Sequence, residues 1–147
     1  MKNTETLNDL IQINNDRVAG YDKAALQTTE EDLRSLFTSM SSHSKQNVTE
    51  LKKLVQAEGE EPAEGSTLAG KIYRTWMDVK ATFSGDNRKN LLASCEFGED
   101  AAQKAYKDAL KEDELSADIR AVIEQQKAAL REAHDKIKNM RDAAQPA

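Results

Sequence analysis

The sequence predicts an all-α protein, a bundle of four long helices paired as two antiparallel hairpins. Aromatic residues make up only 5% of the 147 residues, and there are two prolines and six glycines. Such a composition favours helices over the strands of a sandwich or barrel. In four segments the apolar residues also recur at alternating spacings of four and three, which is typical of the buried seam of a helical bundle.

The first hairpin is expected at about residues 4–27 and 29–58. Thr28 and Thr29, followed by acidic residues, form a helix start signal. So few residues separate the two helices that they must be antiparallel. The seam of the first helix contains Leu7, Ile11, Asn14, Val18, Tyr21 and Ala25. The seam of the second contains Leu33, Phe37, Met40, Ser44, Asn47, Leu51 and Leu54.

A long crossover at about residues 59–86 is expected to join the second and third long helices. Pro62 and its neighbours from Gly59 to Gly65 forbid a helix there. Residues 66–83 then predict a short amphipathic helix, with Leu68, Ile72, Trp76, Val79 and Phe83 on one side. Two hairpins joined by one crossover that travels the length of the bundle is the ferritin-like arrangement.

The second hairpin is expected at about residues 87–112 and 116–142. It starts after Ser84-Gly85-Asp86, and Ser116 is the expected cap of its second helix. The two seams contain Leu92, Cys95, Glu99, Ala102, Tyr106 and Ala109, then Ile119, Ile123, Gln126, Leu130, Ala133, Ile137 and Met140. Residues 1–147 are therefore expected to form one domain, with a frayed tail at about 143–147.

Charge and cysteine content exclude several classes of function. The net charge of −5 argues against a general nucleic-acid binder. A single cysteine, Cys95, excludes an internal disulfide and a thiolate zinc cluster, and its seam position predicts packing rather than nucleophilic chemistry. No secretory signal is visible in residues 1–22 and no stretch reaches the apolar length of a membrane span, so the expected location is the cytoplasm.

Polar residues near the middle of each otherwise apolar seam are the feature that bears most on function. One interpretation is a buried network that sets helix register, in which Asn14, Asn47, Gln126 and the seam glutamate Glu99 pair with one another and with Arg17. The other is a metal site for iron, manganese or zinc, because bundles hold metals with carboxylates and imidazoles that project inward. Its candidate ligands are Glu96, Glu99, His134 and His43.

The pattern of a full di-metal centre is incomplete in this chain. That pattern requires one Glu on each of two helices and Glu-x-x-His on each of the other two. Met40 stands three residues before His43, and Arg131 stands three residues before His134. The metal interpretation is therefore a reduced site.

Four stretches of the chain resemble a known bacterial family. They are residues 10–21 (LIQINNDRVAGY), 76–80 (WMDVK), 95–102 (CEFGEDAA) and 133–137 (AHDKI). Together they resemble a family of four-helix-bundle domains of unknown function that is grouped with the ferritin-like superfamily. The resemblance implies a bacterial source, the ferritin-like topology and a role in stress or envelope physiology, and it assigns no reaction.

The function expected from the sequence is a non-catalytic binding or structural module, in which no residue is catalytic. The alternative is a metal-binding protein or oxidase that uses the four candidate ligands. A homodimer is the expected assembly, formed through an apolar stripe of Leu10, Leu36, Val48 and Val55.

Overall fold

The computed structural model describes residues 2–63 and 88–144, and four α-helices make up almost all of this part. They are α1 (Lys2–Gln27), α2 (Glu31–Ala57), α4 (Arg88–Ala109) and α5 (Ala117–Ala143). The all-α class is thus confirmed, and each long helix lies within a few residues of its expected bounds. The amphipathic helix expected at 66–83 lies outside the described residues.

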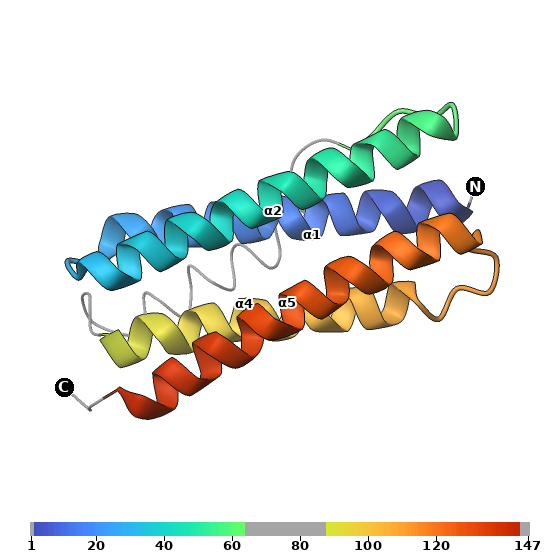
Figure 1. The fold of residues 1–147 in the computed structure, drawn as a ribbon. Helices are drawn as coiled ribbons and strands as arrows, with labels where there is room; N and C mark the ends of the chain where they lie inside the picture. Colours follow the sequence, from blue (N-terminus) through green and yellow to red (C-terminus); the bar gives the residue numbers. More distant parts are fainter. Residues whose placement is uncertain (1, 64–87, 145–147) are drawn as a thin grey trace.

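The helices pack as two antiparallel hairpins (Figure 1). Helix α1 packs extensively against α2, and α4 packs against α5. The hairpins meet mainly through α1 and α4, whereas α2 and α5 touch at few positions. Helix α2 ends and α4 begins at opposite ends of the bundle (Figure 1). The hairpins are therefore closed along one side and more open along the side between α2 and α5.

Two helix starts illustrate how local sequence fixes the boundaries. Ser116 caps α5 as expected, since its hydroxyl accepts a hydrogen bond from the backbone N–H of Ile119 at 3.3 Å. Helix α2 begins later than expected, at Glu31. The Thr28 hydroxyl instead accepts from the backbone N–H of Glu30 at 3.1 Å and so holds the turn between the helices.

Local sequence also fixes the ends of two helices. Gly59, with a φ of +78°, follows α2 in the left-handed conformation that commonly terminates helices. Helix α4 ends at Ala109, earlier than the expected 112. Arg120 donates to the carbonyls of Leu110 and Glu112 at 2.9 and 2.7 Å, so the connecting loop satisfies its polar groups without further helix.

The buried apolar residues form two clusters, one toward each end of the bundle. One cluster includes Leu7 and Ile11 of α1 and Ile123 of α5. The other includes Phe37 of α2 and Ile137 of α5. On α1, α2 and α4, buried polar residues such as Asn14, Ser44 and Glu99 fall between these two groups, whereas Gln126 of α5 lies among residues of the first cluster.

The apolar stripe expected to mediate dimer formation is not on the surface, and this expectation was wrong. Leu10 and Val55 are fully buried, Val48 is nearly so, and Leu36 is partly buried. These side chains pack within the clusters of the chain itself. The large apolar side chains that are exposed among the described residues are Leu26 and Phe97.

No helix in the described ranges, 2–63 and 88–144, is both long and apolar enough to cross a membrane. The helices reach the required length, but each has a polar face.

Candidate functional site

Asn14 lies in the middle of the buried polar residues, and every hydrogen-bonding group of its carboxamide has a partner. Its Nδ2 donates to the backbone carbonyl of Leu10 and to the hydroxyl of Tyr106, both at 2.8 Å. Its Oδ1 accepts from Ser44 Oγ and from Asn47 Nδ2, both at 3.1 Å. Two donors and two acceptor positions are the full capacity of this side chain, so Asn14 fixes α1 against both α2 and α4.

Arg17 and Glu99 form an ion pair in the interior, with 1% and 0% of each residue exposed. Glu99 Oε2 accepts from Arg17 Nη2 and from the Tyr21 hydroxyl. The Arg17 guanidinium also donates to Ser44 Oγ and lies 5.1 Å from the centroid of the Tyr21 ring. A guanidinium thus provides the positive charge that this carboxylate requires inside the bundle.

The surroundings perturb the ionisation of Arg17 and of two neighbouring groups, Tyr21 and Cys95. Burial lowers the pKa of Arg17, but the charge and hydrogen bond of Glu99 together with the nearby tyrosines outweigh it, and the pKa is raised overall. Burial and the Glu99 charge raise the pKa of Tyr21 well above its usual value, so the phenol stays a donor. Burial likewise raises the pKa of the Cys95 thiol well above its usual value, which makes the thiolate scarce.

The hydrogen bonds continue in one direction from Arg17 to the surface. Ser44, after accepting from Arg17, donates to Asn14, and Asn14 donates to Tyr106. The Tyr106 hydroxyl donates to Gln126 Oε1 at 2.6 Å, and Gln126 Nε2 donates to Glu50 Oε1 at 2.7 Å. The chain starts at a cation and ends at a carboxylate, and each bond polarises the next. We call this set of residues the polar layer: Asn14, Arg17, Tyr21, Ser44, Asn47, Glu50, Glu99, Tyr106 and Gln126.

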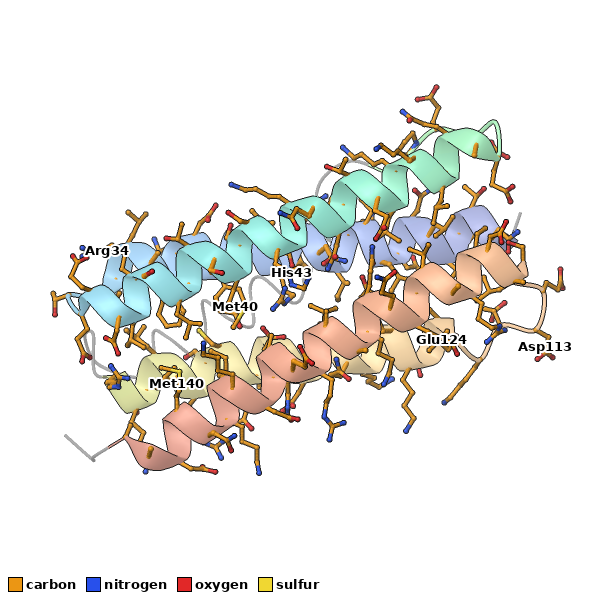
Figure 2. The ribbon with its side chains drawn as sticks, in the orientation of Figure 1. Arg34, Met40, His43, Asp113, Glu124 and Met140 are labelled. Atoms are coloured by element: carbon orange, nitrogen blue, oxygen red, sulfur yellow. The ribbon has the colours of Figure 1, made fainter. Side chains whose placement is uncertain are left out.

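The polar layer reaches solvent in a groove of about 520 Å³ between α2 and α5. The groove exists because these two helices make few contacts. Half-buried His43, near the middle of α2, lines it (Figure 2). Burial, together with the positive charge of Arg17, lowers the pKa of His43. The other lining residues are Gln46, Asn47, Thr49, Glu50, Lys53, Gln125, Gln126 and Ala129.

A second cluster lies between α4 and α5, and it includes the other histidine. One ligand atom from each of Glu96, Asp100 and His134 lies within 4.8 Å of the other two. His134 Nε2 is 2.6 Å from Asp100 Oδ1, and its Nδ1 is 3.1 Å from Asp135 Oδ1. Partial burial lowers the pKa of His134, but the hydrogen bonds to Asp135 and Asp100 and the charges of these two carboxylates together outweigh it, so the pKa is raised. Arg141 donates to Glu96.

The structure divides the four candidate metal ligands among three places. Glu96 and His134 lie together at the α4–α5 interface, Glu99 lies inside with Arg17, and His43 lines the groove. The four candidates for a register network, by contrast, are all in one place. Asn14, Arg17, Asn47 and Gln126 lie in one continuous set of hydrogen bonds.

Sequence reasoning missed several partners in these sites. Asp100 follows Glu96 by four residues, a spacing that puts both on one face of a helix, so the signal was present. Asp135 is adjacent to His134, and Arg141 lies in the last turn of α5, where basic residues are usual. Tyr106 and Tyr21 were placed in the core, but nothing in the sequence indicates which polar groups they contact.

A family described as a domain of unknown function, DUF2383, matches residues 2–112. The chain belongs to this family. The DUF2383 match contains α1, α2 and α4, and with them Asn14, Arg17, Glu99 and Tyr106. It ends before α5, so Gln126 and His134 lie beyond it.

The same architecture occurs in a solved protein. The crystal structure of a conserved hypothetical protein, rv2844, from Mycobacterium tuberculosis superposes with a TM-score of 0.80. The alignment covers 99% of this DUF2383 chain and 94% of the mycobacterial one, at 10% sequence identity. This likeness shows a common fold. No curated protein matches the chain.

Proposed function

We propose that this chain is a non-catalytic, ferritin-like helical module that binds a partner at its surface. The observation that carries the proposal is the polar layer, which contains side chains from all four described helices. Most of its hydrogen-bonding groups are directed at one another inside the bundle. A layer used in this way sets the register of the helices and, within residues 2–63 and 88–144, leaves its own acids and hydroxyls facing one another and not a substrate.

The interior does not suit the di-metal centre that the ferritin-like resemblance implies. Such a centre needs several carboxylates and imidazoles directed at a shared position. Here Arg17 already neutralises the Glu99 carboxylate, and a metal ion beside it would meet a buried positive charge. The two histidines lie elsewhere, His43 in the groove and His134 at the α4–α5 interface.

Removal of metal tests this proposal. The test uses the His134→Ala variant, so that a metal ion held by the cluster at the α4–α5 interface does not contribute. In this variant we expect EDTA to leave the Tm unchanged. We also expect ferrous ion in air to oxidise no faster with the protein than in buffer alone. A resident metal present at about 1,000 times its Kd would contribute about 4 kcal/mol, so its removal would lower the Tm by several degrees. Such a drop, or oxidation that depends on Glu99, would contradict the proposal.

We propose a second copy of the chain as one partner, through a surface other than the buried stripe. The groove between α2 and α5 and the exposed side chains of Leu26 and of Phe97 on α4 are candidate surfaces among the described residues. Size-exclusion chromatography with light scattering on the full chain is expected to give twice the chain mass of 16.3 kDa. A mass of 16.3 kDa at all concentrations would overturn the dimer.

A further inference from the structure

We propose that Glu96, Asp100 and His134 form a binding site for a divalent first-row transition metal, zinc in the first instance, at the α4–α5 interface. Their ligand atoms lie within 4.8 Å of one another. Among the residues that the structure describes, no other set of three histidine, cysteine or acidic side chains converges in this way. The site is outside the polar layer and separate from the interior centre considered above.

The helices supply the three ligands in a geometry that needs little adjustment. Glu96 and Asp100 are four residues apart on α4, so both face α5. Zinc bonds of about 2.0–2.2 Å hold neighbouring ligand atoms roughly 3–4 Å apart. The Asp100 side chain is 63% exposed and can change rotamer, while those of Glu96 and His134 are only 11% and 14% exposed. Two ligands are therefore held by packing and one is adjustable.

The orientation of the imidazole is the feature that distinguishes this cluster from an ordinary surface ion pair. His134 Nδ1 is 3.1 Å from Asp135, while Nε2 faces Asp100 at 2.6 Å. Metal-binding histidines usually donate their second ring N–H to a carboxylate, which fixes the tautomer and ring orientation. With Asp135 accepting from Nδ1–H, Nε2 is the ring nitrogen that faces the carboxylates of α4, and a bound metal ion would take the place of its proton there.

Arg141 competes with a metal ion for the carboxylate of Glu96. Its guanidinium donates to Glu96 and also to Asp142, so it pairs with one of the three ligands in the structure. A metal ion bound by Glu96 would displace this contact, and Arg141 could keep Asp142. Removing the arginine charge should therefore strengthen metal binding, whereas a merely structural ion pair would give no such gain.

The ligand set selects the class of metal. One imidazole and two carboxylates suit zinc, iron or manganese, whereas calcium and magnesium prefer oxygen ligands alone. Two carboxylates and a neutral imidazole also balance the charge of a divalent ion. Three protein ligands leave a coordination position for water, as in open zinc sites.

Zinc titration by calorimetry on the full chain without a histidine tag tests the site. We expect one zinc per chain, with affinity at least about 10-fold weaker in His134→Ala and in Asp100→Asn. Arg141→Gln should bind more tightly than the wild type. The matched controls are His43→Ala, which removes the other histidine, and Asp108→Asn, which removes an exposed acid elsewhere on α4. Both should bind zinc like the wild type.

Two results would overturn the proposal. One is the absence of saturable zinc binding in the wild type. The other is unchanged affinity in both His134→Ala and Asp100→Asn. Because Asp100 is exposed, its substitution should leave the helical circular dichroism intact, so the test does not depend on how well His134→Ala folds.

Discussion

Replacing Arg17 with methionine should lower the free energy of unfolding by about 3–5 kcal/mol, the largest effect that we expect from a single substitution. The change leaves the Glu99 carboxylate buried without its cation, and burial of an unpaired charge is strongly unfavourable. It also removes the donor to Ser44 and the contact with the Tyr21 ring. Urea unfolding followed by far-ultraviolet circular dichroism measures the loss.

The matched control is Arg34→Met, which removes an arginine whose side chain is 47% exposed (Figure 2). Its pairing with Glu31 is a surface ion pair, so the loss should stay within about 1 kcal/mol. A second control is the double variant Arg17→Met/Glu99→Leu, which should be more stable than Arg17→Met alone because it leaves no unpaired charge. Equal losses for Arg17 and Arg34 would contradict the account.

Replacing Tyr106 with phenylalanine should cost about 1–3 kcal/mol, because it interrupts the hydrogen-bond chain at its middle. The hydroxyl both accepts from Asn14 and donates to Gln126, so its loss leaves a buried donor and a buried acceptor without partners. Phenylalanine keeps the ring packed in the core, so the measured loss of stability comes from the hydrogen bonds of the hydroxyl and not from apolar packing. The same urea unfolding measurement applies.

Ser94→Ala is the control for loss of a buried hydroxyl. Ser94 Oγ donates only to the carbonyl of Asn90 within its own helix, at 3.1 Å, and so connects no two helices. Its removal should change stability by less than about 0.5 kcal/mol. If Tyr106→Phe were as mild as Ser94→Ala, the chain from Arg17 to Glu50 would have no energetic role.

The helices were predictable because amphipathic spacing is a property of each segment alone. Leu33, Phe37 and Met40 mark the buried face of α2 without reference to any other helix, and all three are buried. Ser116 identified the start of α5 for the same local reason. Asn14 and Gln126 could also be assigned to the interior, since they occupy seam positions.

The separation of the two sites was not predictable, because it depends on helix rotation. Successive residues on a helix point about 100° apart, so Glu99 and Asp100 face different partners. Glu99 points to Arg17 in the interior, whereas Asp100 points to His134 on α5. Sequence reasoning grouped Glu96, Glu99 and His134 as candidate ligands of one site, but it could not tell which carboxylate shares the side of α4 that faces His134.

The sequence allowed Glu99 two roles, as a partner of Arg17 in a register network or as a metal ligand, and could not choose between them. Both residues belong to the middle of their helices, but 82 positions separate them in the chain. Only the packing of α1 against α4 brings them together, and this contact joins the two hairpins rather than the helices within one. Local patterns therefore predicted the hairpins well and the chemistry between the hairpins poorly.

Elemental analysis of the untagged His134→Ala protein tests most directly whether Arg17, rather than a metal, neutralises the interior. We predict far less than one equivalent of iron, manganese or zinc per chain, together with cooperative unfolding like that of the wild type. About one equivalent of metal that persists in His134→Ala and disappears when Glu99→Gln is added to that variant would contradict the account, because it would place a metal ion in the polar layer.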